Sequence, residues 1–145
     1  MNEKETIYAV IDTNVLVSAL ISRKWTSHPF RVIESVLKGV ITPLYNHEII
    51  TEYRDVLSRK KFNFDPAVVN EIISFFIESG IDTARTPIFD ETFPDADDIV
   101  FYEITMSVDG AYLVTGNTKH FPERPFVITP TRMIEILIEK EILNQ

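Results

Sequence analysis

The sequence predicts an α/β protein, a three-layer α/β/α sandwich in which helices cover both faces of a central parallel sheet. Two observations predict this fold. Short apolar runs rich in β-branched residues alternate with longer segments in which apolar residues recur every three or four positions. Strands that alternate with helices form parallel sheets, because right-handed crossovers return each strand to the same direction. We expect residues 1–145 to form one domain of this kind.

The expected strands are short, and their almost unbroken apolar character suits a sheet that is buried on both faces. Ile7 to Ile11 shows this pattern most clearly, and Ala111 to Thr115 repeats it late in the chain. A weaker signal lies within residues 81–88. In chain order, the expected strands are residues 7–11, 40–44, 81–88, 111–115 and 126–128.

The expected helices each carry an apolar face, and their ends fall at residues that favour helix termini. Asn46 and Asp65 are suitable N-caps, and Pro66 suits a first turn. Gly39 and Gly80 are placed to end helices. In chain order, helices are expected after Asn14, over 28–38, from Asn46 to Leu57, from Pro66 to Gly80, from the acids at 95–98 to about Val108, and from Pro130 onward.

Composition places the chain among soluble globular proteins, with 45% hydrophobic and 25% charged residues. It contains no cysteine, which excludes disulfides and thiolate metal sites but leaves oxygen ligands for Mg²⁺ or Mn²⁺. The net charge of −8 disfavours a broad nucleic-acid-binding surface, although carboxylates clustered around cations would produce the same acidity. No signal peptide or membrane-spanning apolar stretch is visible, so we expect a cytoplasmic protein with no membrane contact.

Asp12 directly follows the first expected strand, at the point where a strand passes into a helix. In parallel sheets, binding sites form outside the carboxyl ends of the strands. Asp12 is therefore a candidate ligand or catalytic acid, and a helix N-cap is the alternative interpretation. Thr13 or Asn14 could provide the cap instead. Asn14 is also placed to orient Asp12 or to donate a hydrogen bond to a phosphate.

Further carboxylates follow on later elements. Glu52 lies beside the apolar stripe of its expected helix, where a glutamate is most often a boundary residue with its head in water. Glu48, one turn earlier, shares that face and is an alternative to Glu52 as a metal ligand. Asp95, Asp97 and Asp98 stand within four positions, and their repulsion requires a cation or a helix N-terminus nearby. Either a metal site or an acid-rich helix start explains the cluster.

Small and polar residues follow the strand that ends at Thr115. Gly116 and Asn117 leave room for a phosphate or for water, although an ordinary strand-to-loop turn has the same composition. Lys119 and His120 come next and could contact a phosphate. Further candidate RNA contacts, for each of which a solvated loop charge is the alternative, are Arg23-Lys24-Trp25, Arg59-Lys60-Lys61 and Arg124.

In this order on an α/β pattern, these residues resemble the PIN-domain family, particularly its VapC-like members, which are toxin components of bacterial toxin–antitoxin systems. The resemblance extends from Ile7 to the strand at Phe126. Its most specific parts are Asp12-Thr13-Asn14-Val15-Leu16-Val17-Ser18-Ala19, Asp95-Ala96-Asp97-Asp98 and Thr115-Gly116-Asn117-Thr118-Lys119-His120-Phe121-Pro122.

The resemblance implies a metal-dependent endoribonuclease that hydrolyses RNA phosphodiester bonds with Mg²⁺ or Mn²⁺, and a small antitoxin protein as its partner. Many relatives carry a fourth acid in the loop where this chain has Asn117 and His120, which leaves a second metal position open. The resemblance assigns the roles of catalytic acid and metal ligand to Asp12, Glu52 and Asp98. Asp97 and Asp95 are further candidate ligands. The residues that we place near the substrate phosphate are Asn14, Thr115, Asn117, Lys119 and His120.

Other functions stay open at this point. A protein that keeps the fold with weak or no nuclease activity would bind RNA or a regulatory protein, and the missing fourth acid supports that interpretation. A receiver domain is disfavoured, because it requires paired acids after the first strand and a lysine on the last strand, and the chain has neither. Phe75-Phe76 and the total of ten phenylalanines suggest self-association as a homodimer.

Overall fold

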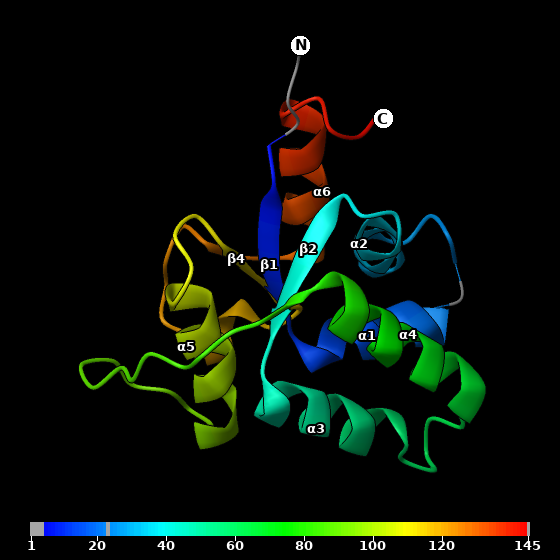
Figure 1. Ribbon diagram of the computed structural model, residues 1–145, viewed down its shortest axis with the longest axis horizontal. Coiled ribbons are helices and arrows are strands. Elements are labelled where there is room, and N and C mark those ends of the chain that lie inside the picture. Colours follow the sequence, from blue (N-terminus) through cyan, green and yellow to red (C-terminus); the bar gives the residue numbers. More distant parts are fainter. Residues whose placement is uncertain (1–4, 23, 145) are drawn as a thin grey trace.

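The structure is a computed structural model that describes residues 5–22 and 24–144. At its centre lies a five-stranded sheet in the order β3-β2-β1-β4-β5, in which every described pairing is parallel. Helices flank this sheet, which confirms the expected α/β/α sandwich (Figure 1). The strands are β1 (Ile7–Ile11), β2 (Ile41–Tyr45), β3 (Ile81–Asp82), β4 (Tyr112–Val114) and β5 (Val127–Ile128).

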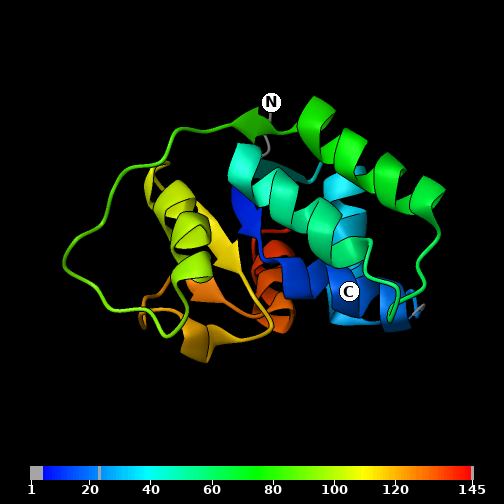
Figure 2. The same ribbon diagram turned by 90° about the horizontal axis from the view of Figure 1, so that it is seen from below.

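The helices are distributed unevenly over the sheet, as the view from the carboxyl ends of the strands shows (Figure 2). Helix α5 and the long segment before it lie on one face, whereas α2, α4 and α6 lie on the other. Helix α3 lies at the carboxyl edge and contacts both α4 and α5. The α-helices are α1 (Thr13–Ser22), α2 (His28–Leu37), α3 (His47–Leu57), α4 (Pro66–Ser79), α5 (Ile99–Met106) and α6 (Pro130–Glu139), and the short 3₁₀ helices are η1 (Ala96–Asp98) and η2 (Thr118–His120).

Helix ends form where local sequence favours them. The Asn46 side chain accepts a hydrogen bond from the Ile49 N–H at 2.9 Å, and Asp65 accepts one from Ala67 at 2.9 Å. Both are the N-caps expected from the sequence, so α3 and α4 begin where predicted. Gly80 ends α4 in very tight packing, because a Cβ there would lie 2.3 Å from the carbonyl oxygen of Pro43 on β2.

One expected element is much shorter in the structure. The strand signal within residues 81–88 yields only the two residues of β3. The Thr83 N–H still donates to the Tyr45 carbonyl at 2.8 Å, and beyond Thr83 the chain leaves the sheet edge and crosses toward α5. There the Ile88 N–H donates to the Glu103 carboxylate at 2.7 Å instead of to a neighbouring strand. A side chain of α5 therefore takes the backbone donor that a longer strand would have used.

The core joins the end of β1 to helices on both sides of the sheet. Tyr53 on α3 is 1% exposed, and its hydroxyl donates a hydrogen bond to the carbonyl of Ile11. Its ring meets Phe76 of α4 at 5.9 Å and Phe101 of α5 at 6.5 Å between centroids. This packing places α3 directly beside the carboxyl end of β1, where Asp12 follows.

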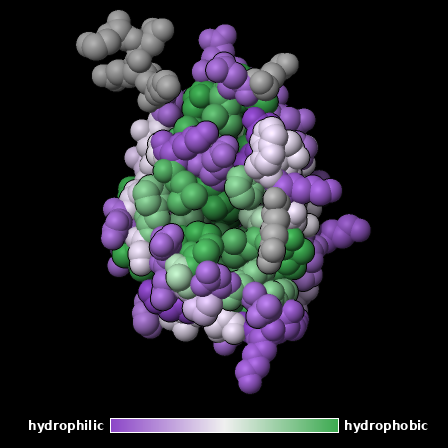
Figure 3. Space-filling view, turned by 90° about the vertical axis from the view of Figure 1, so that its right-hand side faces the viewer, coloured by the Kyte–Doolittle hydropathy of each residue, from purple (hydrophilic) through white to green (hydrophobic). Residues whose placement is uncertain are grey.

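An apolar face is hollowed between α1, α2 and α4, and Figure 3 shows it in green. The groove has a volume of about 410 Å³. Leu37 and Val68 on its rim are 44% and 41% exposed. Within the described ranges, no helix has both the length and the apolar character needed to cross a membrane.

Candidate active site

Asp12 and Thr115 lie side by side at the carboxyl edge of the sheet. β1 and β4 are parallel neighbours that pair Ile11 with Val114, so the residues after each strand meet. The Asp12 N–H continues the ladder by donating to the Val114 carbonyl at 2.9 Å. The Thr115 hydroxyl then donates to Asp12 Oδ2 at 2.8 Å. The parallel register itself thus brings together two residues that are 103 positions apart in the chain.

Asn14 connects the turn after β1 to the turn after β4. Its side-chain Nδ2 donates to Asp12 Oδ2 at 3.2 Å, and its Oδ1 accepts the Gly116 N–H at 2.9 Å. The second bond fixes which way the amide faces, since only its oxygen can accept. Asn14 therefore orients Asp12, one of the two roles expected from the sequence.

The Asp12 carboxyl is buried and hard to ionise. It is 7% exposed, and its pKa is raised from 3.8 to about 6. Burial is the largest cause, and the negative charges of Asp98 and Glu52 add to it, while the hydrogen bond from Thr115 opposes it. The negative charges of both other expected acids therefore act on the Asp12 carboxyl.

Glu52 reaches the same region from α3. The Thr13 hydroxyl, at the start of α1, donates a hydrogen bond to its carboxylate. Burial, followed by the charges of Asp98 and its neighbouring acids, raises the pKa of Glu52, and Thr13 lowers it. Glu48, the alternative ligand on the same helix, forms hydrogen bonds with Arg85 instead.

Asp98, at the end of η1, is the third of these acids. Among the described residues its buried Oδ2 accepts no hydrogen bond, and His120 Nδ1 lies 3.4 Å from it. Burial is the largest cause of its raised pKa, Asp95 adds to it, and His120 opposes it. Asp95 caps η1 by accepting the Asp97 N–H at 2.9 Å. The helix-start interpretation thus accounts for Asp95, whereas Asp98 Oδ2, within the described part of the chain, has the His120 ring beside it but no hydrogen bond.

The loop after β4 supplies polar groups where a fourth acid was absent. Asn117 Nδ2 lies 2.9 Å from His120 Nε2, and the opposite ring nitrogen faces Asp98. The Asn117 N–H donates to the Thr115 hydroxyl at 3.0 Å. Lys119 is exposed on η2. All the residues expected near a phosphate therefore lie at this edge of the sheet or in the loop beside it.

The acids fit a divalent cation in part. Among the described residues, no three His, Asp or Glu side chains form a group that could hold a metal ion, so the expected acids are not preassembled as one set of ligands. Two observations still fit a cation: the unpartnered oxygen of Asp98, and the raised pKa values of Asp12 and Glu52. Mg²⁺ usually takes one or two carboxylates and keeps several waters, so two of these acids with water suffice.

The other basic residues suggested by the sequence contribute less to this site. Arg124 forms an ion pair with Glu91, and Arg59 forms one with Asp55 at 3.3 Å. Trp25 is 74% exposed at the far end of α1, and Arg23 lies outside the described residues. The guanidinium that lies in the acidic groove beside Glu52 is Arg85, which nothing in the sequence singled out.

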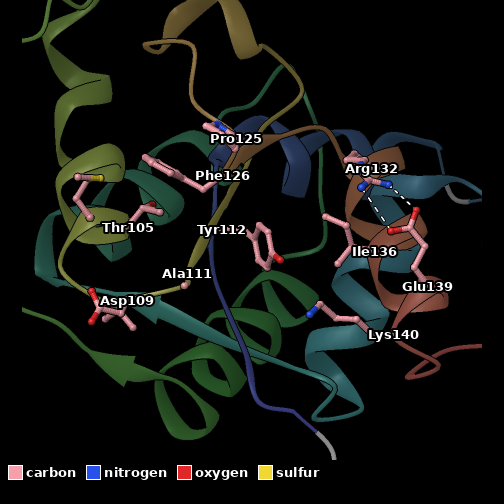
Figure 4. A pocket seen from close by; sticks show the side chains of 13 residues that line it. Thr105, Asp109, Ala111, Tyr112, Pro125, Phe126, Arg132, Ile136, Glu139 and Lys140 are labelled. Carbon is pink, nitrogen blue, oxygen red and sulfur yellow. Dashed lines mark hydrogen bonds and ion pairs between the residues drawn. The ribbon is translucent and has the colours of Figure 1, made fainter.

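A second cavity, of about 540 Å³, opens where β4 begins, at the opposite end of the strand from Thr115 (Figure 4). Tyr112, Phe126 and Ile136 give it apolar walls. Its two cations are already paired, Arg132 with Glu139 and Lys140 with Glu5, each at 2.8 Å. It contains no group of converging acids and is not part of the candidate site.

Comparison with known families identifies the domain. The family model described as "PIN domain" matches residues 8–119. PIN domains are generally nucleases and typically use divalent metals. Neither a curated protein nor a solved structure matches the chain significantly.

Proposed function

The chain belongs to the PIN domain family, and from this premise we propose that it is a metal-dependent endoribonuclease that acts in the cytoplasm. The observation that carries the proposal is that Asp12 lies near enough to Glu52 and Asp98 for their charges to act on it. The three acids come from separate elements. The charges of Glu52 and Asp98 both raise the pKa of Asp12. Such mutual repulsion at one edge of a sheet is what a divalent cation would relieve.

In this proposal the chain's own residues bind and orient. Asp12, Asp98 and Glu52 would hold Mg²⁺ or Mn²⁺ together with water, and Asp97 would be a neighbouring ligand. Such a cation, when bound, would lower the pKa of a water and offset charge on the phosphate. Thr115 and Asn14 fix the Asp12 carboxylate by donating to its Oδ2 at 2.8 and 3.2 Å.

Substrate phosphate is proposed to bind beside η2. The Asn117 amide and the His120 ring are fixed against each other at 2.9 Å and are partly exposed. The exposed ammonium group of Lys119 adds a positive charge that can contact a phosphate at the protein surface. These groups take the place that a fourth acid occupies in many relatives.

A VapC-like toxin role and a small antitoxin as partner complete the proposal. We place such a partner on the apolar groove between α1, α2 and α4, because its walls are mainly apolar side chains. Glu34 and Glu71 line this groove and favour a partner helix with basic residues beside its apolar ones. Sedimentation of the isolated chain tests the alternative, a homodimer: a monomer at micromolar concentration would reject it.

The nuclease is tested by cleavage of a labelled pool of structured RNA with Mn²⁺ or Mg²⁺ against EDTA. Wild-type protein should give metal-dependent products, and Asp12→Asn should give none. Asp109→Asn, which makes the same change at the second cavity, is the matched control and should cleave like wild type. Equal activity of Asp12→Asn and wild type would refute the assignment of Asp12.

A catalytically inactive binding module is the second candidate. Asn117 and His120 in place of a fourth acid favour it. If folded wild-type protein neither cleaves RNA nor binds Mn²⁺ in calorimetry, this candidate replaces the nuclease.

A further inference from the structure

Arg85 connects α3, which carries Glu52, to α5, which begins directly after Asp98. It lies in the segment between β3 and α5, where the chain crosses from one face of the sheet to the other (Figure 2). Its side chain is 34% exposed and lines a groove of about 430 Å³ together with Glu52 and Asp97. Several carboxylates line the same groove, so the Arg85 guanidinium lies among groups with which it can form ion pairs.

On the α5 side, Arg85 is anchored by a buried carboxylate. Glu103 is 4% exposed. Its Oε1 accepts hydrogen bonds from Arg85 Nε, at 2.7 Å, and from Arg85 Nη2. Its Oε2 accepts the Ile88 N–H at 2.7 Å. Both oxygens of a buried acid are therefore satisfied by the 85–88 segment, which makes this anchor costly to break.

On the α3 side, the same guanidinium binds Glu48. Arg85 Nη1 donates to Glu48 Oε1 at 2.9 Å and to Oε2 at 2.7 Å. Glu48 lies one helical turn before Glu52 on α3, and Glu103 lies in the helix that begins directly after Asp98. The planar guanidinium has fixed donor directions, so it sets the separation of its two partners more strictly than an ammonium could.

The same two helices also meet in the core, where the rings of Tyr53 on α3 and Phe101 on α5 lie 6.5 Å apart between centroids. Among the described ion pairs, only those of Arg85 join α3 to α5.

We propose that Arg85 is a positioning residue that, through Glu48 and Glu103, holds α3 and α5 at the separation at which Glu52 and Asp98 serve one cation site. This inference rests on the proposed nuclease function. Arg85 does not contact the cation in this role. It keeps the acids within reach of one another, and loss of either partner lets α3 move away from α5.

Calorimetry of Mn²⁺ binding and an RNA cleavage assay, applied to the wild type and to single variants, test this role. Glu48→Gln removes the α3 connection and leaves the buried Glu103 anchor intact, so the variant should fold. Arg85→Lys keeps the charge and loses the double connection. Each should weaken Mn²⁺ binding about 10-fold, the effect typical of groups that orient metal ligands. Asp55→Asn is the matched control, because Asp55 lines the same groove on α3 but pairs only with Arg59. It should stay within about twofold of wild type.

The double variant Glu48→Gln/Arg85→Lys separates this role from its alternatives. If the two residues act as one connection, the double variant should bind Mn²⁺ no more weakly than either single variant. If Arg85→Lys binds like wild type while Glu48→Gln does not, Glu48 is a ligand in its own right and the proposal is overturned. Equal losses in Glu48→Gln and Asp55→Asn would mean that only groove charge matters, which also overturns it. Absence of Mn²⁺ binding by wild type would instead refute the proposed function itself.

Discussion

Asp12→Asn is expected to change how the stability of this protein depends on pH when divalent metal is absent. Asp12 is 7% exposed, and burial is the largest cause that raises its pKa from 3.8 to about 6. A difference of roughly two pKa units corresponds to about 3 kcal/mol of free energy, at about 1.4 kcal/mol for each unit. The amide of the variant cannot ionise, so the variant should lack this contribution entirely.

The sign follows from which state holds the proton. Between about pH 4 and pH 6 the folded carboxyl of Asp12 is still protonated, whereas the same carboxyl in the unfolded chain has lost its proton. The free energy of unfolding of the wild type must therefore fall as pH rises through this range. Above about pH 7 the loss is complete. Relative to wild type, Asp12→Asn should gain about 3 kcal/mol of stability between about pH 4 and pH 7.5.

Urea denaturation followed by circular dichroism in EDTA measures this difference at each pH. The constant offset between the two proteins is set by how well the introduced amide fits the donors of Thr115 and Asn14, so the test is the change in the offset. Asp109→Asn, far from the site, controls for the general effect of one removed charge. Parallel curves for wild type and Asp12→Asn across this pH range would refute the reasoning, because Asp12 would then be ionised as easily folded as unfolded.

Other perturbations test the metal site and the fold. Mn²⁺ should raise the melting temperature more at about pH 7.5 than at about pH 5, because a proton occupies Asp12 below its pKa of about 6, and equal shifts would argue against Asp12 as a ligand. Gly80→Ala should destabilise the protein by about 2–3 kcal/mol, because its Cβ would lie 2.3 Å from a carbonyl oxygen of β2. Gly39→Ala meets no atom within 4 Å but keeps a φ of +75°, and should cost only about 1 kcal/mol, so equal losses in urea denaturation would contradict the packing argument.

Local sequence predicted much of the architecture. β1 was expected at residues 7–11 and is found there, because a β-branched apolar run has few alternatives to a buried strand. The caps Asn46 and Asp65 fix helix starts through hydrogen bonds within three residues, which are visible in the sequence alone. β3 is the exception, since a distant side chain, Glu103, takes the backbone donor of Ile88.

Part of the candidate site was also accessible from sequence. Asp12 and Asn117 each follow an apolar strand, and parallel strands end at the same edge, so both were expected there. Asn14 was expected to orient Asp12, and its hydrogen bond at 3.2 Å agrees. The role of Glu52 as a ligand stays a prediction, although α3 carries it to the same edge.

What the sequence determined by itself is the set of elements and the acids at their ends, because short-range pattern and capping chemistry act over a few residues. The tertiary structure alone decided which groups those acids meet. The hydroxyl of Thr13 binds Glu52 across 39 positions, and Arg85 joins Glu48 to Glu103 across 37 and 18 positions. The hydrophobic periodicity of the sequence cannot predict such contacts, because they depend on how α3 and α5 pack at the edge of the sheet. The physical reason is that long-range ion pairs are fixed by packing and by the low polarity around buried carboxylates, which exist only once the chain has folded.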